Sequence, residues 1–282
     1  MSTAASVNFD DTLSARDFRE VSSFIYEYCG IKMPETKRSM LEGRLRKRLR
    51  ATGYPTFSEY CDYLFRHGGM EAESVFLIDV VTTNKTDFFR EPNHFDYMEK
   101  IVLPALGRKG VGRIRAWSSA CSTGAEPYTM AMILAEAVEK GTIPDYSILA
   151  TDLSTEVLQK ARSGIYTQEL VDPVPPDLRR KYVLQAKERQ RNDVRITPKL
   201  RSKVGFARMN LMNPTYEIGD PVHILFCRNV LIYFDKKTQI HVLTQLCKCI
   251  APGGYLFIGH SETLTGADLP VKQVANTIFV KQ

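Results

Sequence analysis

The chain has 282 residues, of which 44% are hydrophobic and 25% are charged, as is usual for a globular protein with one large core or two modest ones. No apolar run approaches the roughly 20 residues that span a bilayer, and the first residues lack the basic and apolar segments of a secretion signal. The six cysteines form no CxxC pair and no small disulfide framework, so we expect buried thiols and a reducing, cytoplasmic setting.

The net charge of +6 is concentrated in one segment. Residues 37–50 carry seven basic side chains and the single acid Glu42, so their charge equals that of the whole chain. Three interpretations remain open for this segment: a solvated face without a partner, a nucleic-acid surface, or a surface that meets another acidic partner. Interleaved aromatic residues or a known nucleic-acid module would support nucleic acid, and neither is evident.

The first part of the chain predicts a small all-α domain over residues 12–80. Four helical segments are separated by glycine-containing turns. In the second segment Leu41, Leu45 and Leu49 recur every four residues, which predicts a core stripe beneath the basic faces. Residues 81–100, which include VTTNKTDFFREPNHF, form a predicted linker to the rest of the chain.

From residue 101 onward the strand patterns RIRAWSS, YSILATD, HILFC and YLFIGHS alternate with helical patterns. Such alternation is typical of βαβ units and a mostly parallel sheet. The tail VKQVANTIFVKQ has no crossover helix between its apolar runs, so we expect it to add one antiparallel strand. Residues 164–205 contain three prolines and the charged run KERQRND. This segment is too long for a loop without secondary structure, which predicts an inserted small β subdomain.

The segment GRIRAWSSACSTGAEPYT at 112–129 predicts a strand, a tight turn and the start of a helix. Open α/β sheets bind nucleotide-like ligands at such units, beyond the carboxyl ends of the strands. Glu126 follows the turn, and Asp152 ends the next strand, where an acid can bind ribose hydroxyls. Each acid alone has an alternative role as a helix-start residue favoured by the helix dipole. The turn has a single glycine and matches no dinucleotide or P-loop motif, so a nucleoside without a pyrophosphate, such as S-adenosylmethionine, fits better.

Five sequence motifs carry more information than the spacing of Glu126 and Asp152. TTNKTDFFRE, ACSTGAEPYT, ATDLSTEVLQKARSGIY, FCRNVLIYFD and GGYLFIGHSE occur in this order. Together they resemble the chemotaxis receptor glutamate methyltransferases, the CheR family. The resemblance runs from about residue 15 to the C-terminus and includes the basic helix.

The resemblance implies a class I methyltransferase fold over residues 101–282, with S-adenosylmethionine as methyl donor and part of the site in the 81–100 linker. Arg90 and Tyr233 match the residues nearest the transferred methyl group, and Arg90 would orient either the methionyl carboxylate or the incoming glutamate. One departure is Ala125, because the family often has a second acid before the proline. The implied cofactor-binding residues are Asn84, Thr86, Arg90, Glu126, Asp152, Asn210, Leu211, Cys227, Arg228 and Asn229.

The implied reaction forms glutamate methyl esters on chemotaxis receptors and releases S-adenosylhomocysteine, as part of sensory adaptation. A glutamate of pKa near 4.3 is already ionised at neutral pH, so the transfer needs alignment and desolvation rather than a general base. The implied partner is the set of acidic cytoplasmic receptor helices, which the basic helix would meet through Arg44, Lys47 and Arg48. We expect no nucleic-acid partner and no membrane insertion.

Two finer expectations concern the insertion and metals. Some family members hold a receptor C-terminal peptide through a glycine-containing loop, and the matching segment 186–193 has no glycine, which favours a tether-independent enzyme. The successive residues His260, Ser261 and Glu262 cannot converge as a triad, so a structural role is expected. The histidines lack metal-ligand spacing, so no metal is expected; they are His67, His94, His223, His241 and His260.

Two rival functions remain open. One is a methyltransferase that acts on RNA or on another protein, with the basic helix serving that substrate. The other is a noncatalytic module that binds S-adenosylmethionine or its demethylated product as a signal. Transfer of a labelled methyl group to receptor-containing membranes separates these possibilities.

Overall fold

The computed structural model describes residues 11–186, 192–264, 266 and 268–282. The chain forms two compact units. The first consists of residues 11–83 together with Tyr233–Thr238, and the second of Asn84–Ile232 and Gln239–Gln282. No helix in the described ranges has both the length and the apolar character needed to cross a bilayer.

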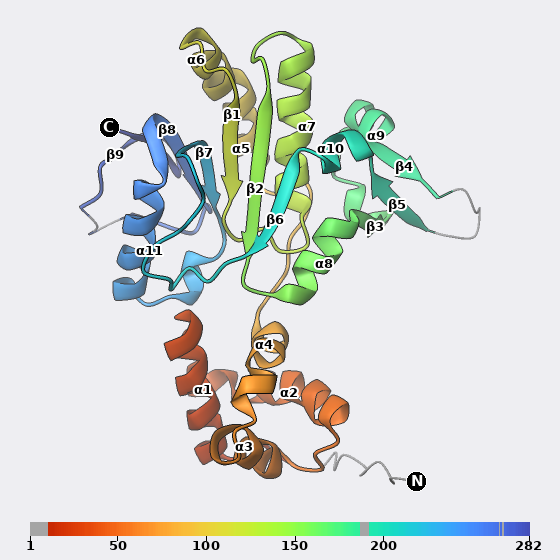
Figure 1. Cartoon of the computed structure of the whole chain (residues 1–282), viewed down its shortest axis with the longest axis vertical. Coiled ribbons are helices and arrows are strands. Elements are labelled where there is room, and N and C mark those ends of the chain that lie inside the picture. The colour runs from red at the N-terminus through yellow and green to blue at the C-terminus, as the bar shows by residue number, and fades with distance from the viewer. Residues whose placement is uncertain (1–10, 187–191, 265, 267) are drawn as a thin grey trace. The chain divides into compact units, whose positions relative to one another are not determined.

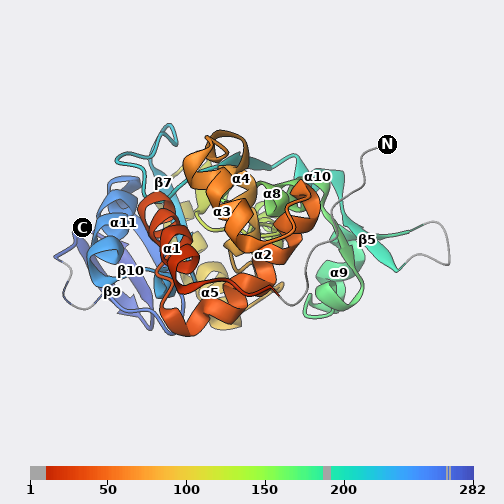
Figure 2. The same cartoon turned by 90° about the horizontal axis from the view of Figure 1, so that it is seen from below.

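The first unit is helical, as the four segments predicted (Figure 2). Ser14 and Thr56 cap the first and third helices through their side chains, and Gly30 and Gly53 end the first and second in the left-handed conformation. The predicted leucine stripe of the second helix is fully buried. The elements are α1 (Ala15–Cys29), η1 (Glu35–Lys37), α2 (Arg38–Thr52), α3 (Phe57–Arg66) and α4 (Met70–Val81).

The second unit is built on a seven-stranded sheet in the order β6-β2-β1-β7-β8-β10-β9 (Figure 1). Five neighbouring strands are parallel, and β10 runs antiparallel to both β8 and β9, which confirms the predicted fold class. The strands are β1 (Ile114–Ser118), β2 (Tyr146–Asp152), β6 (Val204–Arg208), β7 (Val222–Cys227), β8 (Ile250–Ile258), β9 (Val271–Ala275) and β10 (Ile278–Lys281).

Helices of the second unit cover this sheet, and α7 and α8 pack on β1, β2 and β6. The only tryptophan, Trp117, is fully buried in β1, and its indole N–H donates to the Thr151 hydroxyl of β2 at 2.9 Å. The helices are α5 (Pro92–Tyr97), the π-helix η2 (Met98–Val102), α6 (Leu103–Arg108), α7 (Ala125–Glu139) and α8 (Thr155–Ser163). Two more, η4 (Leu231–Tyr233) and α11 (Lys236–Lys248), include residues of the segment Tyr233–Thr238 that belongs to the first unit.

A separate three-stranded antiparallel sheet, in the order β3-β5-β4, forms the small β subdomain between α8 and β6 (Figure 1). The strand β6 belongs to the large sheet. Within the segment 186–193, which carries the expectation of tether independence, residues 187–191 lie outside the described residues. The elements are β3 (Ile165–Thr167), η3 (Glu169–Val171), α9 (Pro176–Tyr182), β4 (Val183–Gln185), β5 (Asp193–Ile196) and α10 (Pro198–Arg201).

Candidate functional site

Four parallel strands of the second unit end at one edge of the large sheet. Their last residues are Ser118, Asp152, Arg208 and Cys227. Because parallel strands share one direction, the segments that follow them lie at the same edge, where open α/β sheets bind ligands. Most of the residues expected to hold the cofactor are in these segments: Glu126, Asp152, Asn210, Leu211, Cys227, Arg228 and Asn229.

Ser122, in the turn after β1, connects two of the predicted residues. Its hydroxyl donates to the backbone carbonyl of Asn84 at 2.7 Å, and its backbone N–H donates to Asp152 Oδ2 at 2.8 Å. Asp152 Oδ1 accepts from the backbone N–H of Ser154 at 3.0 Å. Asp152 is therefore oriented by backbone groups of the segments that follow β1 and β2.

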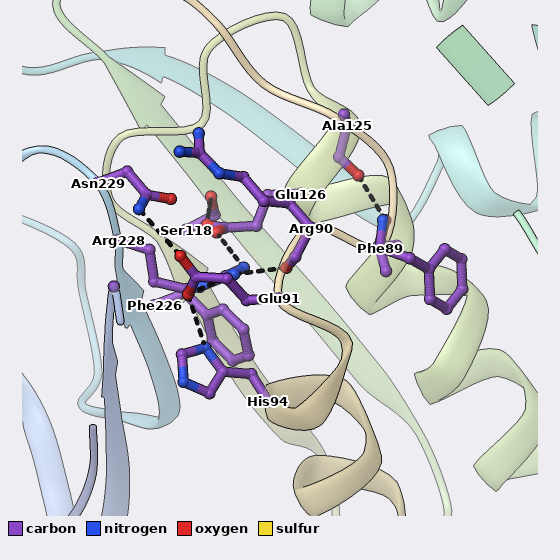
Figure 3. Close-up of polar contacts among 12 residues, drawn as sticks. Phe89, Arg90, Glu91, His94, Ser118, Ala125, Glu126, Phe226, Arg228 and Asn229 are labelled. Carbon is purple, nitrogen blue, oxygen red and sulfur yellow. Dashed lines mark hydrogen bonds and ion pairs between the residues drawn. The ribbon is translucent and has the colours of Figure 1, made fainter. Parts of the chain in front are cut away.

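Arg228 connects the segment after β7 to the helix after β1. Its Nη1 lies 3.0 Å from Glu126 Oε2 and its Nη2 lies 3.0 Å from Glu91 Oε2 (Figure 3). Its Nη2 also donates to the backbone carbonyl of Arg90. The Arg228 side chain is 1% exposed, so the two carboxyl groups must balance its charge.

Glu126 is held at this point by Arg228 and by the Ser118 hydroxyl, which donates to Glu126 Oε1 at 2.6 Å. Burial raises the pKa of Glu126 above its usual range, and Arg228 and Ser118 oppose that rise. Arg228 also lies over the rings of Phe95 and Phe226, 5.4 and 5.6 Å from their centroids. The aromatic faces add to the attraction that fixes the guanidinium.

Glu91 lies among the predicted cofactor residues, although the sequence analysis did not single it out. Its Oε1 accepts from the Asn229 side-chain amide at 3.1 Å, and Figure 3 shows its carboxylate between Arg228, Asn229 and His94. Burial alone would raise the pKa of Glu91, but the Asn229 amide and the Arg228 guanidinium outweigh it and hold that pKa at about 2. Glu91 does fall within the motif TTNKTDFFRE, next to Arg90, but Arg228 and Asn229 are more than 130 residues away along the chain.

The backbone around these residues is strained. Of the five non-glycine residues with positive φ in the described part of the chain, four surround the site: Phe89, Glu91, Ser122 and Asn229, with φ from 49° to 57°. Such conformations cost of the order of 1–3 kcal/mol each and persist where the surrounding structure fixes them. The strain is therefore concentrated in the segments that present polar groups at the strand ends.

Glu262 holds the segment after β7 in place. Its side chain is buried, and its Oε2 accepts from the backbone N–H groups of Gly259 at 2.6 Å and Asn229 at 3.1 Å. Its Oε1 accepts from the N–H of Leu231 at 2.7 Å. Burial raises the pKa of Glu262, although these N–H groups favour the ionised form. Glu262 thus has the structural role expected for the segment His260–Glu262.

The remaining predicted cofactor residues are Asn210, Leu211, Cys227 and Thr86. Asn210 Oδ1 accepts from the backbone N–H of Met212 at 3.0 Å, which shapes the loop after β6. Leu211 and Cys227 are buried, and Thr86 is half-buried. Burial also raises the pKa of the Cys227 thiol well above its usual range, which disfavours the thiolate form.

The two predicted catalytic residues fall in different units. Arg90 belongs to the second unit, and its Nη1 donates to the backbone carbonyl of Lys85 at 3.2 Å. Tyr233 belongs to the first, where its backbone carbonyl accepts from the N–H of Lys32 at 2.9 Å. The ammonium group of Lys37 lies 5.8 Å from the centre of the Tyr233 ring.

The three predicted docking residues differ in their surroundings. Arg44 donates to backbone carbonyls at the end of α4 and to Thr83 Oγ1 at 2.9 Å, so it stabilises the end of that helix. Arg48 pairs with Glu73, and their side chains are 14% and 8% exposed. Lys47 is exposed. Two of the three predicted docking side chains therefore have structural partners inside their own unit.

The polar groups at the strand ends fit the predicted cofactor. Asp152 offers acceptor oxygens, and Arg228 lies between two carboxyl groups, those of Glu91 and Glu126. Two acids around a single buried cation give a region that favours a positively charged ligand. A sulfonium nucleoside with an amino group has this charge and the hydroxyls that Asp152 would accept from.

Comparisons with known proteins identify the family of the chain. The family description "CheR methyltransferase, all-alpha domain" matches residues 16–82, and "CheR methyltransferase, SAM binding domain" matches residues 84–280. The chemotaxis protein methyltransferase of Borreliella burgdorferi is 35% identical over 264 residues, which cover 92% of each chain. That of Escherichia coli is 40% identical over 256 residues, covering 90% of this chain and 86% of the relative. Chemotaxis protein methyltransferase 2 of Pseudomonas aeruginosa is 35% identical over 263 residues, covering 93% and 92%.

Proposed function

We propose that this chain, which belongs to the CheR methyltransferase family, methylates glutamate side chains of chemotaxis receptors. The chain is an S-adenosylmethionine-dependent methyltransferase by family. The observation that supports the finer proposal most strongly is the match to enzymes named chemotaxis protein methyltransferase over at least 90% of this chain. The products would be glutamate methyl esters and S-adenosylhomocysteine, and the process would be sensory adaptation in the cytoplasm.

The residues at the strand ends have distinct roles in this proposal. S-adenosylmethionine supplies a methyl group made electrophilic by the sulfonium charge. Asp152, oriented by Ser122 and Ser154, accepts from the ribose hydroxyls. Glu126, held by Arg228, accepts from the amino group. Arg90 orients a carboxylate, either that of the cofactor or that of the substrate glutamate, and Tyr233 acts near the transferred group.

No general base is needed for this reaction. A glutamate of ordinary pKa, about 4.3, is ionised at neutral pH and attacks without losing a proton. The transfer removes one positive and one negative charge, so desolvation and alignment lower its barrier. The protein's contribution is therefore positioning by fixed side chains.

The basic helix α2 is proposed to meet the acidic cytoplasmic helices of the receptors. Lys47 is exposed, and a positive surface speeds encounter with a negative one and helps to orient it. The absence of glycine in residues 186–193 supports an enzyme that needs no receptor C-terminal tether. Calorimetry with that receptor peptide tests this point, because tight binding would contradict it.

The function is tested by incubating the full chain with methyl-labelled S-adenosylmethionine and receptor-containing membranes. We expect label on the receptor that base treatment releases as methanol, because carboxyl methyl esters are base-labile. Label on RNA, or base-stable label on another protein, would favour the rival methyltransferase function. Cofactor binding without any transfer would favour the sensing module.

The roles of Arg90 and Tyr233 are tested by Arg90→Ala and Tyr233→Phe. Each variant should lower kcat by at least about tenfold, as expected when a positioning contact is lost, with little change in thermal stability. Arg113→Ala is the matched control, because Arg113 is 65% exposed at the opposite end of the sheet. Wild-type turnover in Arg90→Ala would refute the role of that residue.

A further inference from the structure

Three potential metal ligands converge beside the strand-end site. Glu91 and His94 lie at the start of α5, and His260 follows β8. Their ligand atoms all lie within 4.8 Å of one another. His94 Nδ1 is 3.5 Å and His260 Nε2 is 3.8 Å from Glu91 Oε2. We call these three residues the Glu91 cluster.

The hydrogen bonds around His94 determine which of its nitrogens carries the proton. The Thr277 hydroxyl donates to the backbone carbonyl of Asn276 at 2.8 Å, so it accepts from His94 Nε2, which is 2.8 Å away. Neutral His94 therefore has its proton on Nε2 and a lone pair on Nδ1.

That lone pair has no hydrogen-bond partner. His94 is 1% exposed, and its Nδ1 is a buried atom without a donor. It faces a Glu91 carboxylate oxygen, so two acceptors lie 3.5 Å apart in a buried place. A buried acceptor without a donor is unfavourable, because the hydrogen bonds it makes to water in the unfolded chain are not replaced. A cation between the two acceptors would satisfy both.

We propose that the Glu91 cluster binds a divalent transition metal of the Zn²⁺ type through His94 Nδ1, His260 Nε2 and a Glu91 oxygen. Two imidazoles and a carboxylate are ligands that Zn²⁺ prefers. Zn²⁺–ligand distances of about 2.0–2.2 Å place tetrahedral ligand atoms about 3.3–3.6 Å apart. The two separations of 3.5 and 3.8 Å are close to these values. The third, which is within 4.8 Å, closes by a turn of His260, whose side chain is 40% exposed.

Arg228 makes this site inhibitory rather than catalytic. Its Nη2 lies 3.0 Å from the same Glu91 oxygen that the metal would bind, so the two cations compete for it. A bound metal would loosen Arg228 and Asn229, both of which contact Glu91. This coupling rests on the proposed role of Arg228 and Asn229 in cofactor binding. By linkage, metal and cofactor then weaken each other's binding by the same factor.

Metal binding is tested with chelator-treated full chain titrated with Co²⁺, whose visible spectrum reports nitrogen and oxygen ligands in tetrahedral geometry. We expect one Co²⁺ per chain, displaced by Zn²⁺. His260→Ala should weaken binding by at least about tenfold, since even outer-shell changes at metal sites cost 10–100-fold. His67→Ala is the matched control, because His67 is an exposed histidine of the first unit.

Several outcomes would overturn the proposal. They are the absence of Co²⁺ binding, equal binding in wild type and His260→Ala, or a thiolate charge-transfer band that assigns the metal to cysteine. These titrations need neither methyl donor nor receptor, so they do not depend on the proposed reaction. A second titration measures S-adenosylhomocysteine binding with and without saturating Zn²⁺. An unchanged Kd would refute the inhibitory coupling, whereas a rise that His260→Ala abolishes would support it.

Discussion

Arg48 of α2 and Glu73 of α4 form a buried ion pair within the helical unit, with Nη2 2.8 Å and Nε 3.0 Å from the carboxylate oxygens. The Tyr60 hydroxyl donates to the same carboxylate at 3.0 Å. Part of the positive charge of α2 therefore holds two helices together. A glutamate substitution in α2 that breaks such a pair would destabilise the fold. A loss of receptor methylation in that variant could then not be assigned to docking.

We expect Arg48→Met to lower the free energy of unfolding by roughly 3 kcal/mol, because it leaves the Glu73 carboxylate buried without its partner. Lys47→Met removes the same charge from an exposed position and should change stability by less than about 0.5 kcal/mol. Urea unfolding followed by circular dichroism measures both values. Equal stabilities of the two variants would show that the pair has no structural role.

Lys47→Glu should reduce methylation of receptor-containing membranes while leaving S-adenosylhomocysteine affinity unchanged. The physical reason is the loss of electrostatic attraction at an exposed basic residue. The difference in rate between wild type and Lys47→Glu should shrink at high salt, because screening weakens the attraction in the wild type. Initial rates at two ionic strengths, with calorimetry for the cofactor, test this prediction. A salt-independent loss would argue against docking.

Gly124→Ala should destabilise the protein by about 2–4 kcal/mol and weaken cofactor binding. The residue has φ of +94°, and a Cβ would lie 2.8 Å from the Tyr166 hydroxyl and 2.9 Å from the Ala161 Cβ. Overpacking adds to the cost of the left-handed conformation. Gly110→Ala is the control, because it has φ of +70° but open space, and it should cost only about 1 kcal/mol. Equal costs in thermal unfolding would contradict the steric explanation.

Arg228→Lys should raise the Kd for S-adenosylhomocysteine by at least about tenfold, or about 1.4 kcal/mol. A lysine keeps the charge but cannot reach Glu91, Glu126 and the Arg90 carbonyl at once, as the planar guanidinium does. Calorimetry provides the measurement, and Arg113→Lys at the exposed pair with Asp145 is the control. A wild-type Kd in Arg228→Lys would mean that charge alone is sufficient.

Asp145 should give stability a measurable acid dependence. The Lys203 ammonium, which donates to Asp145 at 2.6 Å, is the main cause that holds the pKa of Asp145 at about 2. Because this folded-state pKa is lowered, the contribution is full above the unfolded value of about 4 and is lost as the pH falls towards 2. The groups are partly exposed, so we expect at most about 1 kcal/mol.

The measurement is the difference in unfolding free energy between wild type and Asp145→Asn. It should be constant above about pH 5 and shrink between about pH 4 and 2. Lys203→Met should remove most of this pH dependence. If the difference in unfolding free energy between wild type and Asp145→Asn did not vary with pH, the assigned role of Lys203 would be wrong.

The sequence determined the order and type of the main elements, because their signals are local. The leucine repeat of α2, the strand YSILATD and the glycine-containing turns act through neighbours along the chain. It also determined which strand ends face one edge, since alternating strands and helices imply parallel strands. Glu126 and Asp152 were found in this way. Arg44, Lys47 and Arg48 are the docking residues predicted from the sequence; of these, Lys47 is exposed, and Arg44 and Arg48 are half-buried.

The tertiary structure decided which charges meet. Arg228 pairs with Glu126 and Glu91 across 102 and 137 residues of chain, and Arg48 pairs with Glu73 across 25. Such pairs leave no periodicity or spacing in the sequence, because their geometry depends on how whole strands and helices pack. The grouping of Glu91, His94 and His260 has the same origin. The chain's local patterns specify the scaffold, and the packing of that scaffold specifies the polar site.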